Sequence, residues 1–102
     1  MSTELVKVEH RRFNASIGRA FATRMNAAWA TGATTVVLDL SEVVSIDSLG
    51  VSVLVAAYRG RPPGAQIVLC EVADAVREVL EVTSLHRLFN VYESASAALQ
   101  AA

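Results

Sequence analysis

The residues best placed for chemistry are an adjacent aspartate and serine, Asp47 and Ser48, which stand between two apolar stretches. Residues 36–40 have the composition of a buried strand, and residues 48–59 are apolar almost all the way round at helical spacing. This order places the Ser48 hydroxyl at a helix N-terminus, where free backbone N–H groups and the helix dipole favour an anion such as phosphate. Two interpretations follow: Asp47 and Ser48 only cap the helix, or Ser48 is a regulatory phosphorylation site.

The sequence has none of the common motifs that would indicate an enzyme. The glycine patterns G-x-G-x-x-G and G-x-x-x-x-G-K-[ST], the nucleophile turn G-x-S-x-G and the zinc pair H-E-x-x-H are all absent. The two histidines, His10 and His86, lie far apart and, with the single Cys70, offer no paired spacing for a metal. The spacing also gives no support to Ser48 and His86 as nucleophile and base. We therefore predict a non-enzyme without catalytic residues, metal or cofactor.

Length and composition predict one domain, which we take as residues 1–102. A chain of 102 residues, 53% of them hydrophobic, is long enough to bury a single core. The formal net charge of −1 gives no electrostatic reason to bind nucleic acid or an anionic membrane, and no apolar run reaches the length of a membrane span. The N-terminus lacks the pattern of a secretory signal, and Cys70 lies in a strand-like run where a buried, reduced thiol is expected. We expect a cytoplasmic protein.

Hydrophobic periodicity predicts strands alternating with helices, in the order β-α-β-α-β-α-β-α. The expected strands are residues 4–9 (at an edge), 34–40, 66–72 and a short segment around 91–92; the expected helices are residues 17–30, 48–59, 74–83 and 94–100. Such alternation is typical of an α/β fold with a small, mostly parallel sheet of about four strands and right-handed crossovers. Functional sites in these sheets collect beyond the carboxyl ends of the strands, which is where Asp47 and Ser48 are expected.

Two linked segments resemble the STAS domains of bacterial anti-sigma factor antagonists. In LDLSEVVSIDSLGVSVL (residues 38–54), a strand that ends in D-L-S leads to D-S-x-G at a helix start, as in that family. VLCEVADAVREVLEVTSLHRLF (residues 68–89) is similar to the family's next strand and helix. The resemblance covers about residues 34–95 and implies a STAS fold.

The resemblance also implies a partner switch without enzymatic activity. Unphosphorylated, the protein would bind an anti-sigma factor that is also a serine kinase and so release the sigma factor; phosphorylation of Ser48 would end binding, and a phosphatase would restore it. Gly50 would let another backbone approach closely, and Leu49 and Val51 would supply apolar contact. The expected partner-binding residues are Asn14, Ser16, Asp47, Ser48, Leu49, Gly50 and Val51.

The sequence departs from the family pattern at three places. Many members begin with a β-hairpin, of which this chain has room for only the second strand; Asn14 stands where a variant pattern has aspartate, and Ser84 where glycine is frequent. Two alternatives to the switch remain open. One is a STAS-type subunit that docks a transporter ATPase or a larger signalling assembly with Ser48 unmodified. The other is a module that binds an apolar ligand or a nucleotide.

Overall fold

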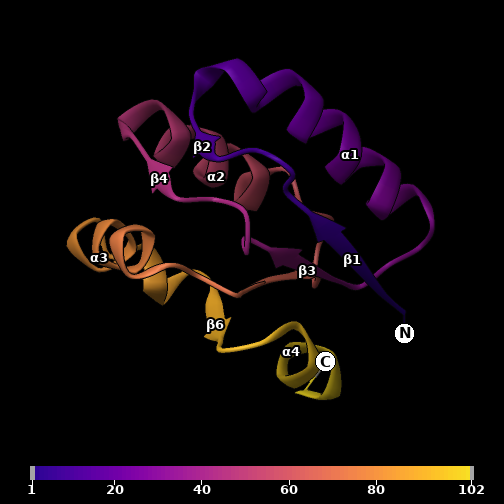
Figure 1. Ribbon diagram of the computed structural model, residues 1–102. Coiled ribbons are helices and arrows are strands. Elements are labelled where there is room, and N and C mark those ends of the chain that lie inside the picture. Colours follow the sequence, from indigo (N-terminus) through magenta and orange to yellow (C-terminus); the bar gives the residue numbers. More distant parts are fainter. Residues whose placement is uncertain (1, 102) are drawn as a thin grey trace.

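In a computed structural model that describes residues 2–101, a four-stranded sheet carries helices on both faces (Figure 1). The strands β1 (Thr3–Lys7), β3 (Thr35–Asp39), β5 (Gln66–Cys70) and β6 (Asn90–Tyr92) lie side by side in chain order. Every neighbouring pair is parallel, with Val6 opposite Leu38 and Leu38 opposite Leu69. The predicted α/β fold is confirmed, and β1 lies at an edge of the sheet as expected.

The helices divide unequally between the two faces of the sheet. Helices α1 (Gly18–Ala30), α2 (Ser48–Arg59) and α3 (Asp74–Val82) pack on one face, and α4 (Ala95–Ala101) covers the other. The division follows from the strand order. Right-handed crossovers that always step to the next strand in the same direction place every connecting helix on the same face. Helix α4 follows the last strand, so the crossover rule does not restrict it to that face.

The two faces of β3 belong to separate hydrophobic clusters. Val36 and Leu38 join the large core beneath α1, α2 and α3, whereas Val37 packs with Val68, Cys70 and Ala98 under α4. Helix α4 packs against β3, β5 and β6. Leu5 of β1 lies opposite Val37 on that face and is 45% exposed, because α4 leaves the edge strand largely uncovered.

The structure adds one strand pairing that the sequence did not predict. Strands β2 (Arg12–Phe13) and β4 (Ser45–Ile46) form a separate two-stranded parallel sheet, with Arg12 opposite Ser45 and Phe13 opposite Ile46. We had expected only connecting segments here, because strands of two residues are too short to show a period-two pattern. A 3-10 turn, η1 (Ala15–Ile17), also precedes α1, where the sequence predicted a helix from residue 17 onward.

A second 3-10 turn, η2 (Leu85–Arg87), follows α3, and Ser84 lies between the two elements. The backbone of Ser84 is left-handed, with φ 61° and ψ 17°. Glycine adopts this conformation without the steric cost that a Cβ atom brings. The conformation gives a physical reason for glycine to be favoured at this position.

Candidate functional site

Helix α2 begins at Ser48, as predicted, and Asp47 is its N-cap. The Asp47 side chain accepts a hydrogen bond from the Gly50 amide at 2.8 Å, and its carbonyl oxygen accepts one from the Val51 amide at 2.9 Å. Ser48 is exposed, and its carbonyl oxygen accepts a hydrogen bond from the Ser52 hydroxyl at 3.2 Å. The Ser48 hydroxyl itself takes part in none of the hydrogen bonds found within residues 2–101. Capping of the helix therefore uses the side chain of Asp47, and the hydroxyl oxygen of Ser48 stays open to solvent.

Gly50 is buried against another part of its own chain. A Cβ atom at this position would overlap the carbonyl oxygen of Phe13, and it would lie 2.7 Å from the Phe13 carbonyl carbon and 2.9 Å from Cγ1 of Ile46. We expected this glycine to admit the backbone of a partner. In the structure, the backbone that comes close is that of β2, so Gly50 sets how closely α2 packs against the β2–β4 pair.

The pairing of β2 with β4 brings Asn14 close to Asp47 in the fold. Each residue directly follows a member of the Phe13–Ile46 pair, and the Asp47 amide donates to the Phe13 carbonyl at 3.4 Å. The Asn14 side-chain oxygen accepts hydrogen bonds from the amide and the hydroxyl of Ser16, at 3.0 Å and 2.6 Å. Asn14 thus caps η1 as a neutral group, and the predicted site residues Asn14 and Ser16 lie at the same end of the molecule as Ser48.

Exposed apolar side chains accompany the Ser48 hydroxyl. Leu49 is 57% exposed, Val44 at the entry to β4 is 46% exposed, and Val51 is half-buried. Sequence reasoning named Leu49 and Val51 but missed three residues that shape the site: Phe13, Val44 and Ile46. The signal available in the sequence was short: one polar residue followed by one apolar residue, in Arg12-Phe13 and in Ser45-Ile46.

Exposed side chains of opposite charge lie on the elements around the β2–β4 pair. The sequence contains no carboxylate between Glu9 and Asp39, and Arg11 and Arg12 are exposed at β2. On the other side, α3 packs against β4, and its outer face exposes Asp74, Glu78 and Glu81. Exposed charges of both signs near an interface can speed the encounter with a protein partner and set its orientation.

Cys70 lies apart from this surface, in β5 beneath α4. The thiol is fully buried, and its sulfur is 3.6 Å from the carbonyl oxygen of Leu38. Burial raises the pKa of Cys70 to about 11, with further contributions from the charges of Asp39 and Glu71. The thiol is therefore protonated at neutral pH, which makes it a poor nucleophile.

Within residues 2–101, no three His, Cys, Asp or Glu side chains are grouped so that they could hold a metal ion. The same part of the chain contains no helix with both the length and the apolar character needed to cross a bilayer.

A sequence model of the STAS domain matches residues 13–98, which is most of the chain. The protein belongs to the STAS domain family.

Solved STAS structures have the same fold as this chain. An anti-sigma factor antagonist from Mycobacterium paratuberculosis has 24% sequence identity and a TM-score of 0.83, over 97% of this chain and 84% of that protein. A STAS-domain anti-sigma factor antagonist from Planctomyces limnophilus has 26% identity and a TM-score of 0.74, over 89% and 80%. The antagonist SpoIIAA in its unphosphorylated form has 15% identity and a TM-score of 0.75, over 97% and 87%.

Proposed function

We propose that this STAS domain is an anti-sigma factor antagonist controlled by phosphorylation of Ser48. The observation that carries the proposal is the exposed Ser48 at the start of α2, beside an exposed Leu49 and beside Asp47, which caps the helix. Family membership and similarity to known antagonists support it. In the unphosphorylated form, the domain binds an anti-sigma factor that has serine-kinase activity, and the sigma factor is released.

The physical basis of the switch is the charge of a phosphate placed in an interface. Phosphorylation adds about −1.5 to −2 charges at pH 7, next to the carboxylate of Asp47. Burying an unpaired charge costs several kcal/mol, and the N-terminus of α2 offsets only about 0.3 to 2 kcal/mol of this cost. Because each ~1.4 kcal/mol corresponds to a tenfold change in affinity, we expect a loss of about two to three orders of magnitude.

The proposal gives this domain the role of a kinase substrate and not of an enzyme. The partner transfers phosphate from ATP to Ser48, and a phosphatase removes it to reset the switch in the cytoplasm. The proposed contact surface includes Leu49 and Val51 at the start of α2, with the polarity set by Arg12 and by the acidic face of α3. Its predicted members are Asn14, Ser16, Asp47, Ser48, Leu49, Gly50 and Val51, and Gly50 acts by setting the position of α2.

The test combines phosphopeptide mapping of the protein from its host with partner capture by Ser48 variants. We expect phosphate on Ser48, capture of the anti-sigma factor by Ser48→Ala, and a loss of about 100-fold or more in affinity for Ser48→Asp. Ser96→Asp is the matched control, because Ser96 is exposed on α4 and lies on the opposite face of the sheet. If Ser48 stays unmodified and both Ser48 variants bind alike, the phosphorylation switch is excluded and a constitutive docking subunit is the better description.

A further inference from the structure

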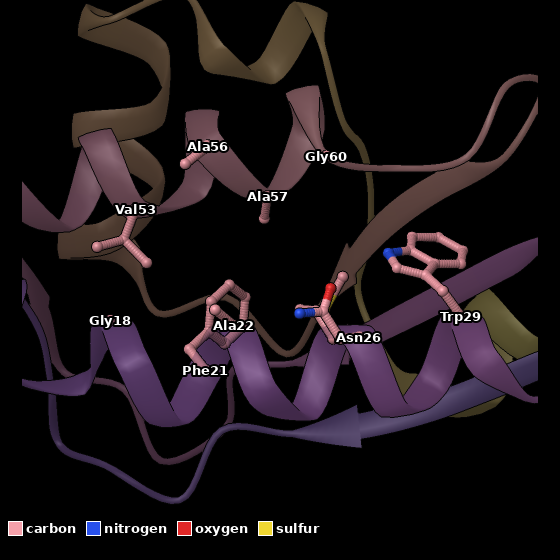
Figure 2. Close-up of a pocket in the computed structure, with 10 residues that line it drawn as sticks. Gly18, Phe21, Ala22, Asn26, Trp29, Val53, Ala56, Ala57 and Gly60 are labelled. Atoms are coloured by element: carbon pink, nitrogen blue, oxygen red, sulfur yellow. The ribbon is translucent and has the colours of Figure 1, made fainter.

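A cavity of about 180 Å³ lies between helices α1 and α2 (Figure 2). Helix α1 contributes three large side chains, those of Phe21, Met25 and Trp29. The facing residues are mostly small: Val53, Ala56 and Ala57 of α2, and Gly60, which directly follows the helix. None of residues 47–51 lines the cavity, so it is separate from the Ser48 surface. The space exists because short side chains on α2 do not fill the gap opposite the large residues of α1.

The cavity is narrow at one end and open at its mouth. The two helices run side by side in the same direction, from Gly18 and Val53 towards Trp29 and Gly60 (Figure 2). At the Gly18 end the helices are close together, since a Cβ atom added to Gly18 would lie in van der Waals contact with Val53, 3.4 Å from its Cγ2. Phe21 and Met25 form a buried floor, with exposed fractions of 5% and 3%. The exposed residues around the mouth are Ala22, Asn26, Ala56 and Gly60.

The lining residues restrict the charge of anything that binds there. The cavity has ten lining residues, and none of them is Asp, Glu, Lys, Arg or His. A charged molecule would leave water without a counter-charge, which is costly. Two polar groups are available, the Asn26 amide and the indole N–H of Trp29, and the indole nitrogen lies on the Asn26 side of the ring (Figure 2). Neither side chain takes part in the hydrogen bonds found within residues 2–101.

We propose that this cavity binds a small, neutral aromatic molecule that carries one hydrogen-bond acceptor, such as a ketone or hydroxyl oxygen. The volume suits one or two rings, since an apolar protein cavity of about 150 Å³ is known to hold benzene. Phe21 and Trp29 offer aromatic contact, and the N–H groups of Asn26 and Trp29 can donate to the acceptor. Binding does not require modification of Ser48.

The sequence contains one tryptophan, Trp29, so intrinsic fluorescence reports directly on this cavity. The experiment titrates the full chain with acetophenone and follows both Trp29 fluorescence and amide NMR shifts. Benzoate is the matched control ligand, because it has nearly the same shape but carries a negative charge. We expect saturable binding of acetophenone, with shifts at Phe21, Trp29 and Ala57, and binding of benzoate at least tenfold weaker. Equal binding of the two ligands, or shifts elsewhere on the domain, would overturn the proposal.

Variants of the lining separate cavity binding from adsorption to the surface. Ala57→Leu fills the space and is expected to weaken acetophenone binding at least tenfold, whereas Ala27→Leu, exposed on α1 outside the cavity, leaves it unchanged. Asn26→Leu changes an exposed position, so it is expected to fold even if Ala57→Leu does not. It is expected to weaken binding of acetophenone but not of ethylbenzene, which lacks the acceptor. Unchanged acetophenone binding in Asn26→Leu would contradict the assigned polar contact.

The Ser48→Ala variant distinguishes this inference from the proposed switch. It is expected to bind acetophenone as the unmodified chain does, because Ser48 does not line the cavity. Failure of the titration therefore leaves the phosphorylation switch intact, and failure of partner capture leaves the cavity proposal intact.

Discussion

The carbonyl group of Phe13 occupies the space that a side chain on Gly50 would need. The Phe13 carbonyl carbon is 2.7 Å from the place of that missing Cβ atom. Residue 13 belongs to β2 and residue 50 to the first turn of α2, so the absence of a side chain lets α2 approach the β2–β4 pair closely. The position of Ser48, two residues earlier, depends on this contact.

Replacing Gly50 by alanine is expected to destabilise the domain by about 1 to 3 kcal/mol, because the obstructing group is backbone and cannot rotate away. Gly60→Ala is the matched control. A Cβ atom at Gly60 would lie 3.4 Å from the Ala56 carbonyl oxygen, so only a small adjustment is needed. Urea unfolding of both variants measures the difference. A Gly50→Ala domain as stable as Gly60→Ala would contradict the close packing of α2 on β2.

Ser84→Gly is expected to stabilise the domain by up to about 1 kcal/mol. The left-handed backbone at Ser84 costs a residue with a Cβ atom about 1–2 kcal/mol, and glycine removes this cost. Part of the gain is offset because glycine has more conformational freedom to lose when the chain folds. Glu71 also has a positive φ, of 58°, but its carboxylate accepts a hydrogen bond from the Ala95 amide at 3.0 Å. Glu71→Gly loses that bond and should bring no gain. Thermal unfolding of both variants tests the contrast.

Leu49→Ala is expected to weaken partner binding about tenfold or more while leaving the free energy of unfolding nearly unchanged. The side chain is 57% exposed in the free domain, so it contributes little to the core and is available to an interface. Leu99→Ala provides the control, since Leu99 is 43% exposed on α4, on the other face of the sheet. Isothermal titration against the anti-sigma partner would measure both. Equal affinities for the two variants would argue against a contact surface at the start of α2.

Cys70 is expected to make stability fall at alkaline pH. The pKa of its thiol rises from 9.0 to about 11 in the folded chain, so the unfolded state loses the proton first. The contribution of the protonated thiol to the free energy of unfolding is fully present below pH 9. It is lost as the pH rises from 9 towards 11, at up to about 1.4 kcal/mol per pH unit. Urea unfolding of the natural chain and of Cys70→Val across this range isolates the effect. Parallel curves for the two proteins would show that the thiol makes no such contribution.

The main elements could be predicted because their sequence patterns are long. Helix α2 is apolar for twelve residues and follows an Asp-Ser cap, so its first residue, Ser48, was located correctly. Strands β2 and β4 have two residues each and carry no period that a sequence shows. The environment of Gly50 depends on that pairing, and for this reason its contact with Phe13 could not be foreseen.

The cavity shows a similar limit of sequence reasoning. In the sequence, Ala56 and Ala57 predict only an apolar helix and Gly60 predicts a turn after it, and none of the three gives the distance between α1 and α2. A stripe of small residues on one helix opposite Phe21 and Trp29 on its neighbour was the available signal. This stripe leaves a cavity only at the helix separation that the fold sets, with Gly18 of α1 facing Val53 of α2.

The order β1-β3-β5-β6 has a consequence for how the protein is made on the ribosome. Each strand joins a neighbour that has already been synthesised, so the sheet can grow in one direction as the chain emerges, without waiting for a later segment to insert. Strand β1 can pair as soon as β3 has been synthesised, and helix α1 then has a sheet to pack on. The site at the start of α2 is complete once β2 and β4 have paired. Helix α4, translated last, closes the remaining face over Val37 and Cys70 and so completes the burial of the thiol.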